Sequence, residues 1–281
     1  MFLLAGAFIV VMLGTTLPTP MYALYAERMH FSVLTTTVIF ATYAVGVLVA
    51  LLGFGSWSDA IGRRPMLLAG AAAAAASALV FLCAQSVGEL LIGRLLSGIS
   101  AGIFTGTATA AVIESAPAAW RSRAAVVATV ANTGGLGLGP VLSGVLVQYG
   151  PHPLQLPFAL HLVLVFAAVV AVLCAGETAH RGGRIGLQRL KVPPLTRTVF
   201  AIAATAAFAG FAVMGLFTAV SPSFVAGVLG ITNHAAAGAL VSGLFAASVL
   251  GQVLSRTITP STAIAVGWAD SIGCRNTGLL E

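Results

Sequence analysis

Long uncharged stretches alternate along the 281-residue chain with short segments that hold nearly all of its charged residues. A membrane-spanning helix needs about 20 mainly apolar residues, and every one of these stretches reaches that length. The stretches are 2–26, 31–57, 65–88, 90–113 (interrupted only by Arg94), 124–176 and 198–255. The last two are each long enough for two helices, with turns at 150–153 and near 230–234. The pattern predicts eight transmembrane helices, followed by an apolar run, 258–268, that is too short to span.

The composition indicates that lipid is the main solvent of the chain. Hydrophobic residues make up 59% and charged residues 7% of the sequence, whereas soluble domains average about 25% charged residues. Apolar residues cover both faces of each stretch, which favours helices over the alternating strands of a β-barrel. The first stretch follows no basic segment, which argues against a cleaved signal peptide. We therefore predict an all-α membrane protein and exclude a soluble enzyme, a disordered chain and a nucleic-acid-binding domain.

The sequence contains no pattern typical of a catalytic or metal site. Cys83, Cys174 and Cys274 lie far apart and form no CxxC pair, so neither a disulfide framework nor a zinc site follows from them. Histidines, cysteines and carboxylates do not cluster in any predicted span. We expect a protein that is not an enzyme, with no catalytic residues, no metal and no cofactor.

Basic residues are distributed very unequally between the two ends of the predicted helices. The segments after the second, fourth, sixth and eighth helices carry Arg63, Arg64, Arg121, Arg123, Arg181, Arg184, Arg189, Lys191, Arg197 and Arg256, and the other connecting segments carry only Arg28. Cytoplasmic loops retain lysine and arginine. We predict a multi-pass protein of the plasma (inner) membrane, with its N-terminus and basic loops in the cytoplasm. The net charge of +6 is then a topology signal.

The longest polar stretch divides the chain into two unequal parts. Residues 177–197 hold five of these basic residues and the pairs Gly182-Gly183 and Pro193-Pro194. A loop of this length is unusual between helices, so a cytoplasmic linker is favoured over a simple surface loop. The predicted domains are a six-helix bundle (1–176), this linker (177–197) and two further helices (198–256), with 257–281 left as the short apolar run and an unassigned tail.

The loop after the second predicted helix groups several residues with physical uses. Gly55 permits close helix contact, and Asp59 places a carboxylate where the helix leaves the membrane. Gly62 permits a tight turn, while Arg63 and Arg64 hold the loop at the cytoplasmic face. The alternative is an ordinary basic turn.

At these positions the chain resembles the major facilitator superfamily, whose signature in this loop is G-x-x-x-D-R-x-G-R-R. Gly55, Asp59, Gly62, Arg63 and Arg64 match, and Ala60 replaces the first arginine. The resemblance implies a loop that helps to latch two bundles in the outward-facing state. Members typically have twelve helices, six per bundle. The expected fold is therefore the helical bundle of this superfamily, with the N-terminal six-helix bundle complete and only two helices of the C-terminal bundle.

The fourth predicted helix places a charge inside the membrane. Arg94, Gly98, Gly102 and Gly106 recur at a spacing of four and so share one face. A charge within a span is a functional candidate by default. In the alternative interpretation, Arg94 lies close to Glu89 and its side chain extends to the outer interface. In the family, an arginine followed by glycines in this helix is linked to proton transfer.

The fifth predicted helix resembles the G-x-x-x-G-P-x-x-G-G pattern of proton-coupled drug antiporters in this superfamily. Gly135, Gly139, Pro140 and Gly144 match, and Ser143 replaces the first of the paired glycines. Pro140 removes a backbone hydrogen bond and bends the helix. The resemblance implies export, whereas the alternative is generic packing of small residues.

The first helix, with Gly14, Pro18 and Pro20, looks like the corresponding helix of the same antiporters. We interpret Tyr22 and Tyr25, which follow, as interfacial anchors.

Few polar side chains lie deep in the spans. The candidate substrate or proton path consists of Arg94, Asn132 and His161, while Asp59 and Glu114 lie at cytoplasmic ends. His161 is the one deep side chain that titrates near neutral pH. A hydrogen-bonded packing histidine is at least an equal alternative.

The residues and the resemblance together predict a secondary active transporter. It exports small amphipathic molecules by alternating access, with the proton gradient as the suspected energy source. Its partners are the lipid bilayer and a small-molecule substrate, and no nucleic acid. Two alternatives stay open. The chain could be a truncated, non-transporting fragment, which could associate with another chain, or a carrier of the same superfamily for sugars or other metabolites.

Overall fold

The computed structural model describes residues 1–178, 193–227, 230 and 233–254. Its helices are α1 (Phe2–Thr16), α2 (Tyr22–Met29), α3 (Val33–Phe54), α4 (Trp57–Ile61), α5 (Arg63–Cys83), α6 (Val87–Glu114), α7 (Ala124–Tyr149), α8 (Leu156–Cys174), α9 (Arg197–Gly227) and α10 (His234–Leu254). Short 3-10 turns are η1 (Thr19–Met21), η2 (Ala118–Arg123) and η3 (Pro194–Thr196). Within the described residues, eight helices are long and apolar enough to cross a membrane, which confirms the predicted number.

The first span differs from the single helix predicted over 2–26. It consists of α1, η1 and α2, which together make one membrane-length segment, Phe2–Met29. Pro18 and Pro20 cause the break, because proline lacks the N–H that an α-helix needs in its interior. The predicted run 258–268 lies outside the described residues. The division of the chain at 177–197 stays a prediction.

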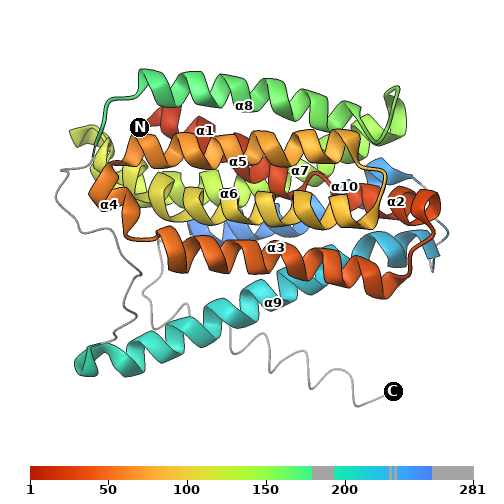
Figure 1. The fold of residues 1–281 in the computed structure, drawn as a ribbon. Coiled ribbons are helices and arrows are strands. Elements are labelled where there is room, and N and C mark those ends of the chain that lie inside the picture. Colours follow the sequence, from red (N-terminus) through yellow and green to blue (C-terminus); the bar gives the residue numbers. More distant parts are fainter. Residues whose placement is uncertain (179–192, 228–229, 231–232, 255–281) are drawn as a thin grey trace, which may run out of the picture.

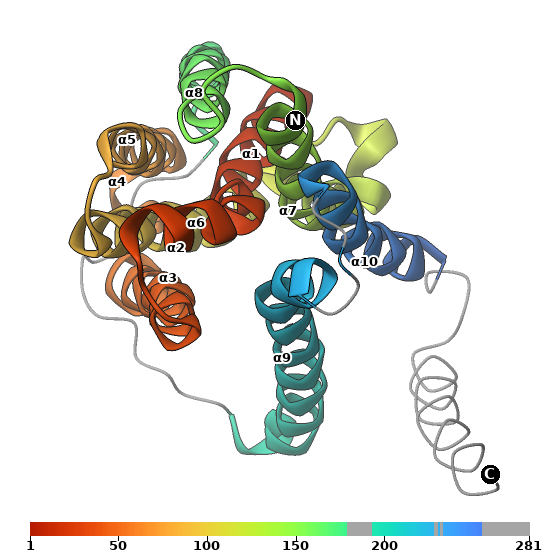
Figure 2. The same cartoon turned by 90° about the vertical axis from the view of Figure 1, so that its right-hand side faces the viewer.

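The helices run roughly side by side in a bundle (Figure 1). α6 packs between α3 and α5, and α7 packs between α1 and α10. α8 covers α1 and α5 on one side of the bundle, as the end view shows (Figure 2). α9 is inclined to the other helices and contacts α10 near one of its ends (Figure 1).

Close contacts between small residues hold the helices together. Added Cβ atoms at Gly98 and Gly102 of α6 would overlap the carbonyl oxygen of Tyr43 and the Cβ of Ala50, both on α3. In lipid, helix association depends on this kind of van der Waals packing. The glycine stripe predicted on α6 is therefore the surface that receives α3, whereas Gly106 has open space beside it.

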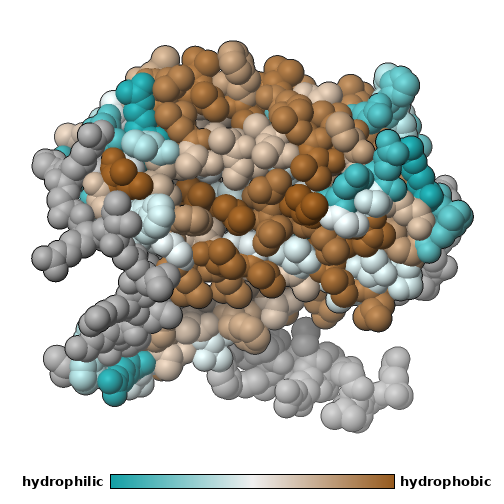
Figure 3. Space-filling model, viewed as in Figure 1, coloured by the Kyte–Doolittle hydropathy of each residue, from teal (hydrophilic) through white to brown (hydrophobic). Residues whose placement is uncertain are grey.

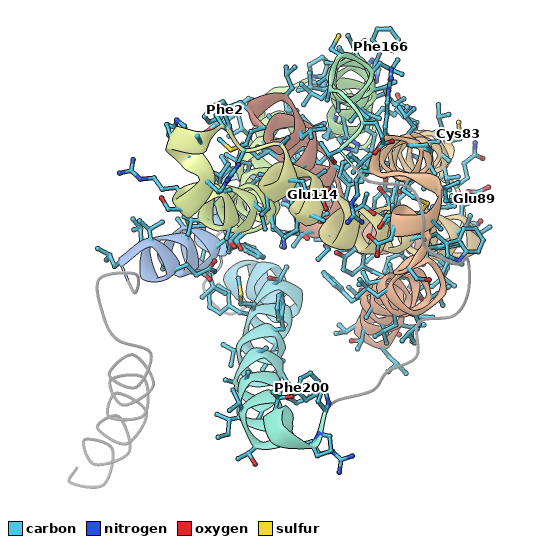
Figure 4. The ribbon with its side chains drawn as sticks, turned by 90° about the vertical axis from the view of Figure 1, so that its left-hand side faces the viewer. Phe2, Cys83, Glu89, Glu114, Phe166 and Phe200 are labelled. Atoms are coloured by element: carbon cyan, nitrogen blue, oxygen red, sulfur yellow. The ribbon has the colours of Figure 1, made fainter. Side chains whose placement is uncertain are left out.

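The surface of the bundle has the distribution expected of a membrane protein. Hydrophobic residues cover the middle of the molecule, and hydrophilic residues gather at the two ends of the helices (Figure 3). Large apolar side chains point outward, among them Phe166 of α8 and Phe200 of α9, which are 71% and 56% exposed (Figure 4). Lipid can solvate these side chains, and the backbone polar groups are satisfied within the helices. We call the end that carries Arg63, Arg64, Arg121 and Arg123 the basic end.

Candidate functional site

An ionic cluster at the basic end joins three helices. The guanidinium of Arg63, at the start of α5, lies 2.7 Å from Asp59 Oδ1 of α4 and 2.8 Å from Glu114 Oε1 of α6. Arg63 Nε also donates to Glu114 Oε2 at 3.2 Å, so the contact with Glu114 is bidentate. Figure 4 shows Glu114 among the helix ends of this face. Asp59 and Arg63, both predicted from the loop motif, therefore interact, and Glu114 joins them.

Glu177 occupies the N-terminus of α5, a role that the sequence interpretation missed. Its two carboxylate oxygens accept hydrogen bonds from the backbone N–H groups of Arg63 and Arg64, at 2.8 and 3.2 Å. The first N–H groups of a helix have no partner inside the helix, and the helix dipole favours an anion at this point. The sequence offered one indication of this role, because Glu177 is an acidic residue that directly follows the sixth predicted helix. The sequence pattern places Glu177 only at the start of the predicted linker.

Gly62 makes this arrangement possible. Its φ of +114° lies in a region that side-chain-bearing residues rarely adopt. A Cβ on Gly62 would also lie 2.5 Å from Glu177 Oε2. Arg64 completes the cluster from its other side by donating to the carbonyl oxygen of Leu173, in α8, at 2.7 Å. The predicted loop residues thus contact α6, α8 and the segment that follows α8. Gly55, the remaining residue of the motif, ends α3.

We expect Gly62→Ala to destabilise the basic end. The substitution forces an unfavourable backbone conformation, at a cost of about 1–3 kcal/mol, and pushes the Glu177 carboxylate away from α5. A lower midpoint of thermal unfolding and faster trypsin cleavage after Arg63 should report the change. Gly53→Ala is the matched control, because open space surrounds that glycine in α3. Equal midpoints for the two variants would contradict the prediction.

Arg94 lies inside the bundle rather than at its surface. It is 2% exposed, and it donates hydrogen bonds to the hydroxyl of Tyr22 and to the carbonyl oxygen of Thr15. Its guanidinium carbon lies 5.1–5.7 Å from the ring centroids of Tyr22, Phe40 and Tyr43. Cation–π attraction of this kind is strongest where the charge is desolvated. The alternative in which Arg94 extends to the outer interface is therefore wrong.

The same contacts correct the interpretation of two tyrosines. Tyr22 and Tyr25 are 5% and 1% exposed, so they are core residues and not interfacial anchors. Among the described residues no carboxylate pairs with Arg94, and its Nη2 makes no hydrogen bond. A buried charge with incomplete compensation is costly. Arg94 thus keeps the status of a functional candidate.

The glycines of α7 face two different neighbours. Added Cβ atoms at Gly135 and Gly139 would lie 2.7 and 2.5 Å from backbone oxygens of α1. One at Gly144 would lie 2.6 Å from the carbonyl oxygen of His234, at the start of α10. One at Gly238 of α10 would overlap the carbonyl oxygen of Pro140. The motif predicted on this helix therefore serves one contact with α1 and a second contact with α10.

The α7–α10 contact extends to the end opposite the basic end. Gly144 lies near the last turn of α7, where the side-chain oxygen of Gln148 accepts a hydrogen bond from the backbone N–H of His234 at 2.9 Å. Gly137, near the middle of α7, would bring a Cβ within 2.8 Å of the Cβ of Phe245. Backbone contacts therefore close α7 against α10 from the middle of the helices to this end.

A cavity of about 190 Å³ lies between α7, α9 and α10, nearer the basic end of α7 and α10. Its lining combines four hydrogen-bonding side chains with five small or apolar residues and contains no charged side chain: Asn132, Thr133, Leu136, Ala207, Gly210, Phe211, Met214, Ser248 and Gln252. Ligand pockets typically pair an apolar lining with a few polar groups that fix orientation. This cavity can hold a small molecule, or part of a larger one, by apolar contact and a few hydrogen bonds.

The three residues of the predicted path do not lie together. Asn132 lines the α7–α9–α10 cavity. Arg94 is enclosed by α1, α2 and α3, as described above. His161 is 4% exposed, and its Nε2 lies 3.2 Å from the carbonyl oxygen of Val10 in α1. The structure thus brings only Asn132 to the cavity.

Sequence comparisons place the chain among membrane transporters. The Major Facilitator Superfamily model matches residues 4–274. Multidrug resistance protein 2 of Bacillus subtilis (strain 168) is 28% identical over 173 residues, which make up 62% of this chain and 41% of that protein. The class D tetracycline resistance protein of Salmonella ordonez is 33% identical over 132 residues, 45% of this chain and 31% of that protein. The matches thus span less than half of the length of these two relatives.

Solved structures share the fold at low sequence identity. The human organic anion transporter TETRAN superposes with a TM-score of 0.67 at 20% identity, over 92% of this chain and 72% of its own. A bacterial homologue of the human lysosomal transporter Spinster, in an inward-facing and unoccupied conformation, gives the same TM-score at 17% identity. That match covers 92% of this chain and 62% of the homologue.

Proposed function

This chain belongs to the major facilitator superfamily of secondary transporters, and we propose that it exports small amphipathic molecules by proton-linked alternating access. The cavity between α7, α9 and α10 carries the proposal, because it offers apolar walls and hydrogen-bonding groups without a charged side chain. The relatives that confer resistance to tetracycline and to multiple drugs favour export. The whole carrier's activity stays a proposal, since the chain spans only part of these relatives.

The proposed conformation is inward-facing. Basic residues at the α4–α5 loop and η2 favour the cytoplasm for that end. The α7–α10 contact then closes the outer half, while the cavity lies in the cytoplasmic half. A substrate would enter this cavity from the cytoplasm and leave after α7 and α10 separate.

The absence of charged side chains in the lining of the cavity indicates the charge of the substrate. A buried unpaired charge is costly without a partner of opposite sign, and none is present among the described lining residues. We therefore propose an uncharged amphipathic substrate. A sugar carrier is less well supported, because most positions in the lining are apolar or glycine and offer a sugar few hydrogen bonds.

The test is transport by the full 281-residue chain in proteoliposomes with an imposed pH gradient. We expect movement of the uncharged dye Nile red that stops when an ionophore collapses the gradient. Asn132→Leu should slow it by about tenfold, through loss of one hydrogen bond. Thr129→Val is the control, because that exposed hydroxyl bonds only to its own helix.

Each outcome addresses one part of the proposal. Transport that is independent of the gradient would refute proton coupling. No transport by the unaltered chain would favour a non-transporting fragment. Equal rates for Asn132→Leu and Thr129→Val would remove the cavity as the substrate site.

A further inference from the structure

A second, much smaller cavity lies inside the bundle, between α1, α5, α6 and α8. Its volume is about 10 Å³, and its lining includes five polar residues: Thr15, Ser77, Ser97, Ser100 and His161. Each of them is at most 5% exposed. The residues come from all four helices, so several polar groups converge at this point of the interior.

Three of the four hydroxyl groups already donate their single hydrogen to a hydrogen bond within the protein. Thr15, Ser77 and Ser100 each donate to a backbone carbonyl oxygen at 2.7–2.8 Å. A hydroxyl has one donor and two lone pairs. Toward a guest in the cavity these side chains can therefore act only as acceptors.

The His161 ring contributes one further acceptor. Its Nε2 faces the carbonyl oxygen of Val10, and a carbonyl can only accept, so Nε2 carries the hydrogen in the neutral ring. Nδ1 then carries a lone pair. The absence of a side chain at Gly14 leaves room for the ring, because a Cβ there would overlap the imidazole.

Ser97 is the one hydroxyl of the group that lacks a hydrogen bond within the described residues, although it is 95% buried. A buried polar group without a partner destabilises the fold. In a membrane interior no bulk water is available to satisfy it. The site thus presents one free donor and several lone pairs around a small space.

We propose that this cavity holds a single water molecule. A cavity of about 10–15 Å³ accommodates one water, provided that it offers two to four polar partners. The water accepts the Ser97 hydrogen and donates its own two hydrogens to the lone pairs around it. It thereby links α1, α5, α6 and α8, which then move as one unit whatever solute the chain transports.

The charges nearby favour water over a cation. Arg94 donates to the carbonyl oxygen of Thr15, a residue that lines the cavity, and no carboxylate among the described residues pairs with Arg94. A sodium ion would add a second positive charge close to the first in a medium of low dielectric constant. The occupant is therefore neutral.

A structure of the unaltered chain at a resolution that shows ordered water tests the occupant directly. We expect one peak within hydrogen-bonding distance of Ser97 Oγ. An empty cavity would overturn the proposal.

Thermal unfolding in nanodiscs distinguishes water from a cation. The midpoint of unfolding should be the same in sodium chloride and in choline chloride. A higher midpoint in sodium chloride alone would assign the cavity to a cation instead.

Two matched substitutions test the link between the helices. Ser97→Ala removes the only donor and should lower the midpoint of thermal unfolding by about 2–4 °C. Ser143→Ala is the control, because that fully buried hydroxyl bonds only to carbonyls of its own helix, α7. Equal midpoints for the two variants would show that the water does not hold the helices together.

Discussion

Gly238→Leu is expected to abolish transport while the chain still inserts into the membrane. A side chain at this position of α10 would meet the carbonyl oxygen of Pro140, and a backbone atom of α7 cannot turn aside as a flexible side chain can. Overpacking costs about 1–3 kcal/mol, and the states of a carrier differ by only a few kcal/mol. A strain near 3 kcal/mol changes the ratio of two states by about 100-fold. We expect α7 and α10 to separate, and the half that is closed in the proposed inward-facing state to open.

Cysteine crosslinking measures this separation. Gln148 and His234 are hydrogen-bonded at the end of the α7–α10 contact, so a cysteine pair at these positions should crosslink in a background without the native cysteines. Gly238→Leu should reduce the yield and stop transport. Gly243→Leu is the control, because open space surrounds that glycine on the same helix. Efficient crosslinking and normal transport in Gly238→Leu would show that this contact does not determine the state.

Arg94→Ala and Arg94→Lys are both expected to abolish transport, while the amount of protein in the membrane stays near normal. Arg94 forms no ion pair with a carboxylate among the described residues. Its substitution therefore leaves no buried carboxylate without a partner, and the loss of stability that follows from breaking a buried ion pair is not expected. Lysine keeps the charge but cannot match the planar group that contacts both Tyr22 and the Thr15 carbonyl. We therefore expect that only arginine supports transport at this position.

Transport rates and membrane levels, measured together, separate function from folding. Arg121→Ala is the control, because that arginine is exposed at the basic end. Normal transport by both Arg94 variants would give the residue a structural role. A loss of protein from the membrane in parallel with transport would point to the same conclusion.

The location of Gly139 changes what its substitution is expected to do. Gly139 belongs to the same antiporter-like pattern as Gly144. In the structure Gly139 faces α1, within the same group of packed helices, so the strain falls on the packing of that group. Gly144 and Gly238 lie in the contact between α7 and α10, where strain changes the position of α10 relative to α7. One motif thus contains residues with two different roles.

The sequence alone determined the eight spans and their approximate limits, because crossing a membrane depends on local hydrophobicity over about 20 residues. It also identified the α4–α5 loop, Arg94 and the glycines of α6 and α7, since charges and small residues stand out in an apolar chain. It did not reveal which helix each of these residues meets. The spans are apolar on every face, so periodicity along them carries little information about which side faces a partner.

Only the tertiary structure decided the partners. The aromatic rings around Arg94 come from residues 51 to 72 positions earlier in the chain, and Glu177 reaches α5 from the segment after the sixth span. The α7–α9–α10 cavity collects Asn132 with residues of two distant helices and leaves Arg94 and His161 elsewhere. Such contacts depend on how helices of similar composition arrange around one another in lipid, where close packing and buried polar bonds select among the possible arrangements.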